Sequence, residues 1–175
     1  MAKKDSIDMT STSCIRLVLT ALVCIIIWQL PVQASDLPVK VDYSRTVEQM
    51  VADGKYDWSH PDITAKNFRI HSQRKVELTI KLINFNRNMT SKEVLRELDK
   101  QGLRPSTLPE LLAFGAKYPD QQREFPIVAL GSVWRSFGGR RDVPYLWSRS
   151  SGRGLGLSWL DRRWSSLCRF AAVRK

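Results

Sequence analysis

Residues 102–112 have the sequence GLRPSTLPELL, and this stretch predicts how the middle of the chain is built. Thr107 and Glu110 have the spacing of a capping box, in which each side chain satisfies a backbone N–H group of the other residue. The two leucines that follow share one helix face with Phe114. The stretch therefore predicts a helix that begins after Thr107 and ends before Pro119.

A second capping box lies just before this stretch. Thr90 and Glu93 have the same spacing and predict another helix, which ends at Gly102 because glycine commonly follows the last residue of a helix. The side chains of this helix that we expect to face inward are Val94, Leu95 and Leu98.

The preceding part of the chain predicts a small βαβ-type segment. Apolar and polar residues alternate over residues 76–82, which is typical of a half-buried strand. A shorter alternation over residues 39–43 predicts its mate, and a helix capped by Ser44 and stopped by Gly54 lies between the two. Residues 56–72 have no periodicity and predict an irregular connection.

Beyond Pro126 the pattern changes to short apolar runs separated by turn residues, which indicates antiparallel strands. The predicted fold class is therefore α+β: an antiparallel β meander with two flanking helices, preceded by the βαβ-type segment. The expected divisions are 35–100 for the amino-terminal α+β segment and 101–175 for the carboxy-terminal domain. The apolar runs of the meander are residues 127–134, 143–147, 155–160 and 164–173.

Residues 1–34 predict an export signal. Basic residues precede an apolar stretch at 17–30, and small residues stand where signal peptidase would read them for cleavage after Ala34. The expected location is therefore the periplasm or the cell surface. Two alternatives stay open: an uncleaved membrane anchor formed by residues 15–30, and a mis-assigned start codon upstream of a cytoplasmic protein.

The charge of the chain favours acidic partners. Lys and Arg number 28 against 17 Asp and Glu, a formal net charge of +11. Ten basic and two acidic residues fall within residues 135–175, so +8 of this charge belongs to the carboxy-terminal part. The tryptophans at 134, 147, 159 and 164 are interleaved with these arginines. This pattern suits either base stacking beside phosphate contacts or a solvated basic rim over core tryptophans.

The sequence offers few candidates for catalytic or metal-binding residues. His60 and His71 are the only histidines, and no His, Cys or Asp spacing resembles a metal site. Cys168 alternates with aromatic residues, as a packing cysteine would, and it alone would remain after cleavage at Ala34. That cleavage would exclude an intrachain disulfide in the mature chain. We predict no catalytic residue, no metal and no cofactor.

Residues 147–167 have an unusual composition for β-structure. They comprise six Ser, four Arg, four Leu, three Gly, three Trp and one Asp. Strand alternation predicts that Leu155, Leu157 and Trp159 face inward. The intervening Gly154, Gly156 and Ser158 are expected to face outward and to be freely exchangeable.

The motif of residues 102–112 resembles the helix start G-W-R-L-P-T-x-x-E-L of bacterial C-type-lectin-fold proteins related to the formylglycine-generating enzyme. The end of the chain, with Trp164, Cys168-Arg169-Phe170 and Val173-Arg174, is similar to their closing strand. The resemblance covers roughly residues 101–175 and implies a C-type-lectin-like domain. Enzyme members of this group use a pair of active-site cysteines, and only Cys168 lies in the matching region. An oxidase of that type is therefore disfavoured and is the third choice of function.

Within that fold the chain resembles the variable proteins of diversity-generating retroelements, in which an error-prone reverse transcriptase rewrites the carboxy-terminal coding region. Substitution of AAC codons in these systems yields Ser, Gly, Arg, Leu and Asp but never Trp. The resemblance implies a non-catalytic display protein with a variable region at 147–167, held on scaffold tryptophans, that recognises acidic or protein ligands. The residues it implies for ligand contact are Ser148, Arg149, Arg153, Gly154, Gly156, Ser158, Arg162, Arg163, Ser165, Ser166 and Leu167. The main alternative is a basic module that binds nucleic acid or an anionic surface, and homo-oligomerisation stays open.

Overall fold

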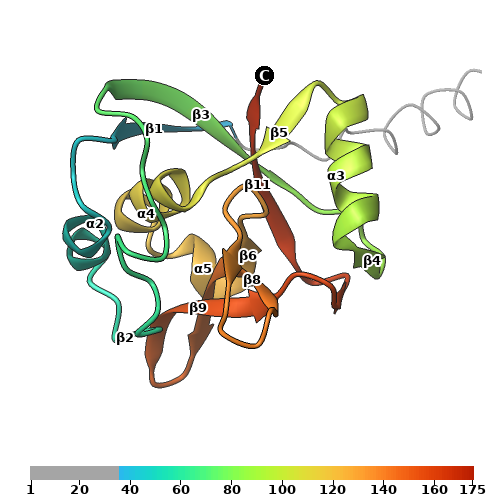
Figure 1. Ribbon diagram of the computed structural model, residues 1–175. Helices are drawn as coiled ribbons and strands as arrows, with labels where there is room; N and C mark the ends of the chain where they lie inside the picture. The colour runs from blue at the N-terminus through green and yellow to red at the C-terminus, as the bar shows by residue number, and fades with distance from the viewer. Residues whose placement is uncertain (1–35) are drawn as a thin grey trace, which may run out of the picture. The chain divides into compact units, whose positions relative to one another are not determined.

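The computed structural model describes residues 36–175 (Figure 1). The predicted α+β class is confirmed: the described chain is mixed, with more strands than helices and one large sheet. The predicted export signal lies outside the described residues. Within residues 36–175, none of the helices has the length and apolar character needed to cross a bilayer.

The elements are β1 (Asp36–Asp42), α2 (Val47–Asp53), β2 (Trp58–Ser59), β3 (Lys75–Ile83), β4 (Met89–Thr90), α3 (Ser91–Lys100), β5 (Leu103–Pro105), α4 (Leu108–Lys117), α5 (Gln121–Glu124), β6 (Ile127–Val128), β7 (Trp134–Arg135), β8 (Arg141–Arg149), β9 (Gly152–Trp159), β10 (Arg163–Trp164) and β11 (Arg169–Arg174).

The large sheet has the strand order β1-β3-β11-β6-β8-β9-β2, with β5 on β11 and β7 on β8. The predicted antiparallel pairing of β8 with β9 is confirmed. A simple meander is wrong for the last strand, because β11 returns to the centre, antiparallel to β3 and parallel to β6. Its residues Phe170, Ala171, Ala172 and Val173 are all buried, as a strand covered on both faces requires.

The first strands pair as the alternation predicted. β1 and β3 are antiparallel, with Val39 opposite Leu78. The cap of α2 is Thr46 and not Ser44. Ser44 instead donates its hydroxyl to Oδ1 of Asp42 at 2.5 Å, so it closes the turn after β1. β3 also pairs with β11, which joins the amino-terminal segment and the carboxy-terminal strands in one sheet.

Helix α3 begins and ends as predicted. The N–H of Thr90 donates to Oε2 of Glu93 at 2.7 Å, and Gly102 follows the helix with a φ of +67°, which favours glycine. Val94 and Leu98 are buried, but the prediction that Leu95 faces inward is wrong, because it is exposed. Val94 and Leu98 are four positions apart and so share one helix face, and Leu95 lies outside that buried face.

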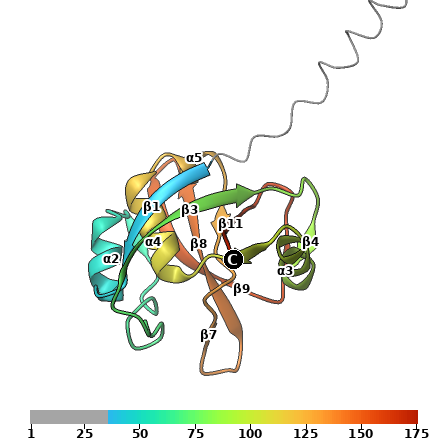
Figure 2. The same ribbon diagram turned by 90° about the horizontal axis from the view of Figure 1, so that it is seen from above.

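Two cores lie on opposite sides of the central strand. Figures 1 and 2 both place α3 on the other side of β11 from α2 and α4. The first core contains the buried face of α4 with residues of β1, β8 and β9, and the second contains the buried residues of α3 with Trp164 and Phe170. The described fold therefore has helices on both faces of β11, which fits the burial of that strand on both faces.

Helix α4 carries a buried carboxylate at its start. Glu110 is buried and accepts hydrogen bonds from Arg104 Nη2 at 2.7 Å, from the hydroxyl of Tyr43 at 2.8 Å and from the N–H of Thr107 at 2.8 Å. Burial acts to raise the pKa of the Glu110 carboxyl, but these hydrogen bonds outweigh it and hold the pKa below its ordinary value. Burial, and then the hydrogen bond with Glu110, raise the pKa of Tyr43 to about 12.

Protonation of Glu110 should weaken the fold in acid. A carboxyl whose pKa is lower in the folded state stabilises the fold above its unfolded pKa and loses that contribution as the pH falls through the folded pKa. We expect the Glu110→Gln variant to be about 1 to 3 kcal/mol less stable at pH 7 and to lose less stability below about pH 4.5. Urea denaturation between pH 3 and 7 measures this, with Glu77→Gln on an exposed position as the control. Identical pH profiles for Glu110→Gln and the unchanged chain would contradict it.

Candidate functional site

The β8–β9 hairpin carries most of the residues that the sequence analysis assigns to ligand binding. Its register places Tyr145 opposite Gly156 and Trp147 opposite Gly154. Because side chains alternate between the two faces of a strand, these four positions share one face of the hairpin. Arg149 extends the same face toward the turn.

The glycines of this face lie beneath aromatic rings. A Cβ atom on Gly154 would lie 2.1 Å from Cε2 of Trp147, and one on Gly156 would lie 2.7 Å from Cε1 of Tyr145. Ser158 is buried as well. The prediction that Gly154, Gly156 and Ser158 face outward into solvent is therefore wrong. The rings of Trp147 and Tyr145 fill the space above the two glycines.

The other face of β9 is buried only in part. Leu155 is buried, as predicted, and Leu157 packs against the first core. Trp159 is 50% exposed, so the prediction that it is a buried scaffold residue is wrong; it is the last residue of β9 and lies outside both cores. Trp164 is buried as predicted, 3% exposed, and its indole N–H donates to Oγ of Ser91 at 2.8 Å.

Arg153 lies in the interior. Its Nη1 donates to the carbonyl of Gly54 at 2.9 Å, and its Nη2 donates to the carbonyl of Gly115 at 2.7 Å and to Oε1 of Gln122 at 3.0 Å. The guanidinium carbon also lies 5.1 Å from the ring centroid of Tyr56. The expectation that Arg153 faces a ligand is wrong, because its guanidinium group is buried and donates hydrogen bonds to backbone carbonyls that are remote in sequence.

An exposed aromatic and basic surface remains on the hairpin. The guanidinium carbon of Arg149 lies 5.0 Å from the ring centroid of Trp147. Trp58, which is 46% exposed, has its ring centroid 5.9 Å from that of Trp147. Arg162 is exposed and donates from Nη1 to Oγ of Ser158 at 3.1 Å. We call this surface the Tyr145 face; it consists of Trp58, Tyr145, Trp147, Arg149 and Arg162.

Two arginines act on the phenol at the centre of the Tyr145 face. Burial raises the pKa of Tyr145, and the positive charges of Arg162 and Arg149 oppose that rise. Both guanidinium groups therefore lie within electrostatic reach of one hydroxyl. A ligand carboxylate or phosphate beside this hydroxyl would meet two positive charges and a phenolic donor.

Four further predicted ligand residues are exposed in the loop between β9 and β11, which includes the short strand β10. They are Arg163, Ser165, Ser166 and Leu167, the last of which is 71% exposed. The loop backbone is held by two asparagines: Nδ2 of Asn84 donates to the carbonyl of Ser166 at 2.9 Å, and the N–H of Ser166 donates to Oδ1 of Asn88 at 3.1 Å. The side chains project from a backbone that has its own hydrogen bonds.

Sequence reasoning missed two residues of the Tyr145 face. Trp58 belongs to a segment predicted to be irregular, and it reaches the hairpin because β2 pairs in parallel with β9, opposite Gly154. For Tyr145 the sequence predicts only a place in the apolar run 143–147, with no role in a site. By contrast Ser148, a predicted ligand residue, is half-buried and donates its hydroxyl to the carbonyl of Gly152 at 3.2 Å within the turn.

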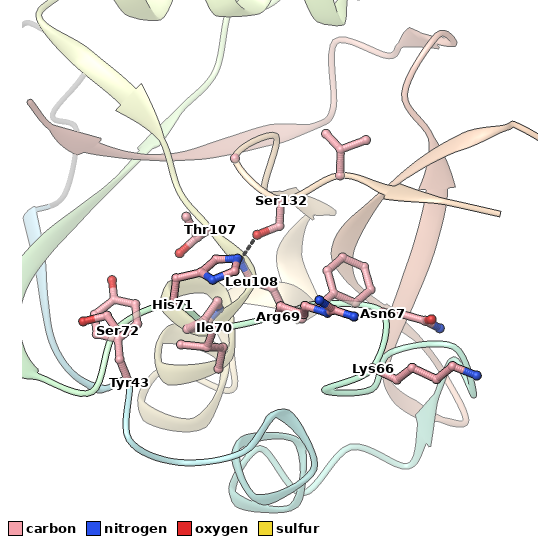
Figure 3. A pocket seen from close by; sticks show the side chains of 14 residues that line it. Tyr43, Lys66, Asn67, Arg69, Ile70, His71, Ser72, Thr107, Leu108 and Ser132 are labelled. Atoms are coloured by element: carbon pink, nitrogen blue, oxygen red, sulfur yellow. Dashed lines mark hydrogen bonds between the residues drawn. The ribbon is translucent and has the colours of Figure 1, made fainter.

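A separate pocket opens between residues 66–72, the start of α4 and residues 131–133 (Figure 3). Its volume is about 590 Å³. Figure 3 shows His71, Thr107 and Ser132 among the residues that line the pocket, with Arg69 and Lys66 further along the 66–72 segment. The N–H of Leu108 donates to Oγ of Ser132 at 2.8 Å, which joins the 131–133 loop to the helix.

Comparisons with known proteins give no indication of function. No protein-family model, no curated protein and no solved structure matches the chain. Among residues 36–175, no group of three or more His, Cys, Asp or Glu side chains is placed to hold a metal ion. The Tyr145 face, the loop after β9 and the pocket at α4 are therefore the candidate sites of the described chain.

Trp159, at the end of β9, and Trp164, in β10, should differ sharply in their effect on stability. We expect Trp164→Ala to cost about 3 to 5 kcal/mol, because it empties a buried site and removes the partner of Ser91. Trp159→Ala should cost about 1 kcal/mol or less, because half of that side chain is already in water. Guanidinium denaturation followed by tryptophan fluorescence measures both. Losses of equal size would show that Trp159 is packed as tightly as Trp164.

Arg153 should behave as a core residue. We expect Arg153→Ala to cost at least about 3 kcal/mol, because it leaves the carbonyls of Gly54 and Gly115 buried without donors. The matched control is Arg163→Ala, an exposed arginine on the next strand, which should stay within about 0.5 kcal/mol of the unchanged chain. Thermal unfolding followed by circular dichroism distinguishes them, and a stable Arg153→Ala protein would return this residue to the candidate ligand contacts.

Proposed function

We propose that this chain is a non-catalytic display protein of the C-type-lectin-like kind, whose carboxy-terminal surface is diversified to bind acidic or protein ligands. The observation that carries the proposal is the division within residues 160–168. Trp164 and Cys168 are buried, whereas the neighbouring Arg163, Ser165 and Leu167 are exposed to solvent. Side chains on such a loop can change without disturbing the core.

The Tyr145 face supplies the chemistry for an acidic ligand. Arg149 and Arg162 are both exposed, and each guanidinium lies over an indole ring, at 5.0 Å from Trp147 and at 5.3 Å from Trp164. Stacking on a ring restricts the guanidinium group, so less side-chain freedom is lost when it meets a carboxylate. The face would provide a constant acidic preference, and the adjacent loop would provide selectivity.

The burial pattern narrows the proposed exchangeable set. Gly154, Gly156, Ser158 and Arg153 are packed, so exchange at these positions would disturb the hairpin. The proposed variable positions are therefore Arg163, Ser165, Ser166 and Leu167, and Arg149 and Arg162 form the constant part. Export to the periplasm or cell surface, through residues 1–34, belongs to the same proposal.

A second candidate function is the binding of single-stranded nucleic acid. The observation that favours it is the exposed indole of Trp58, whose centroid lies 5.9 Å from that of Trp147 beside Arg149. Aromatic rings beside arginines can stack bases while the arginines contact phosphates. This candidate differs from the first in which ligand binds more tightly, single-stranded DNA or an acidic peptide. Its contacts with phosphates would also make DNA binding fall steeply with salt.

The full chain should bind polyglutamate peptide more tightly than mixed-sequence single-stranded DNA at 150 mM salt. Arg149→Ala and Arg162→Ala together should weaken polyglutamate binding about tenfold or more, whereas Arg174→Ala, an exposed arginine on β11, should leave it within twofold. Random substitution of Arg163, Ser165, Ser166 and Leu167 should keep the melting temperature nearly unchanged.

Each component can fail separately. Tighter DNA binding, with a steep salt dependence that is lost with Arg149 and Arg162, would favour the nucleic-acid candidate. Equal weakening by Arg174→Ala would remove the Tyr145 face from the proposal. Large losses of stability in most loop substitutions would overturn the display function, because the loop would then be packed structure.

A further inference from the structure

We propose that the pocket between residues 66–72 and the start of α4 binds a small organic anion, in which an apolar body carries one acidic group. None of the residues that line this pocket belongs to the Tyr145 face or to the loop after β9. The inference is therefore independent of the proposed display function.

The pocket has the size and walls of a small-molecule site. Its volume of about 590 Å³ falls inside the range of roughly 300 to 1,000 Å³ that such sites occupy. Its apolar lining comes from three separate segments of the chain. These residues are Phe68, Ile70, Leu108, Pro109 and Val133. An apolar body of several rings or a short branched chain would be removed from water here.

The charge around the pocket is of one sign. Lys66 and Arg69 line it, and no Asp or Glu does so among residues 36–175. Within that part of the chain neither Lys66 nor Arg69 is in an ion pair. The nearby carboxylate of Glu110 accepts bonds from Arg104 and Tyr43, so it does not compensate this charge.

Two hydroxyl groups complete the polar part of the pocket. Thr107 Oγ1 is buried and has no hydrogen-bond partner within the described chain. Ser132 Oγ accepts from the N–H of Leu108, so its own proton remains to be donated. A buried hydroxyl without a partner costs free energy, and an acceptor oxygen on a ligand would remove that cost. Two hydroxyl groups and two basic side chains, Lys66 and Arg69, therefore line the same pocket.

The probe that matches this chemistry is 8-anilinonaphthalene-1-sulfonate, which has an aromatic body and one sulfonate. We expect the folded full chain to bind it saturably at this pocket, with perturbed amide signals in residues 69–72, 107 and 108. The uncharged N-phenyl-1-naphthylamine should bind at least about tenfold more weakly, because hydrogen bonds to charged groups contribute about a tenfold change or more in affinity.

A matched pair of variants at one exposed position tests the charge. Val133 is 45% exposed at the rim, so both Val133→Glu and Val133→Gln should fold normally. Val133→Glu should weaken binding of the sulfonate about tenfold by repulsion, and Val133→Gln should leave it within twofold. Arg69→Gln should also weaken binding, and the double variant Arg149→Gln/Arg162→Gln should leave it unchanged.

Four outcomes would overturn the proposal. They are the absence of saturable binding, equal affinity for the uncharged probe, equal effects of Val133→Glu and Val133→Gln, and loss of binding with the Arg149→Gln/Arg162→Gln pair. The last would move the probe to the Tyr145 face and would leave the display function standing. Conversely, failure of polyglutamate binding at the Tyr145 face would leave the pocket proposal untouched.

Discussion

The buried guanidinium of Arg153 joins β9 to three helical parts of the chain by hydrogen bonds. A single side chain of β9 donates to the carbonyls of Gly54 after α2 and Gly115 in α4, and to the amide oxygen of Gln122 in α5. Gln122 in turn donates to the carbonyls of Trp147 and Gly154 on the two strands of the hairpin. A buried charge tolerates little displacement of its partners, so this network determines where the hairpin lies against the helices.

The exposed aromatic surface depends on the same contacts. The N–H of Arg153 donates to Oδ2 of Asp57 at 2.7 Å, and the next residue, Trp58, pairs with Gly154. The ring of Trp147 can lie over Gly154 only because glycine has no side chain there. In β9, Arg153 thus makes hydrogen bonds in the interior, whereas Gly154 and Gly156 leave space for the rings of Trp147 and Tyr145 on the opposite face. Rigid rings under exposed arginines are a suitable support for ligand recognition.

The sequence predicted local elements well and the candidate site in part. The spacing of Thr90 with Glu93 and of Thr107 with Glu110 identified the starts of α3 and α4, because capping involves residues only three positions apart. At α4 only the bond from the N–H of Thr107 to Glu110 forms. Arg149 and Arg162 were predicted as ligand contacts and are exposed. The exposure of Trp159 and the burial of Arg153 were not predicted, since each depends on what lies opposite a strand and not on the strand itself.

The sequence by itself determined the α+β class, the pairing of the first two long strands, the starts of α3 and α4 and the basic character of the carboxy-terminal part. These follow from periodicity, capping and charge, which act between residues close together in the chain. Only the tertiary structure decided that β11 lies between β3 and β6, that Trp58 joins the hairpin, and that a basic pocket forms at α4. Each of these depends on contacts between residues tens of positions apart, whose partners are chosen by packing of the whole sheet and not by any local pattern.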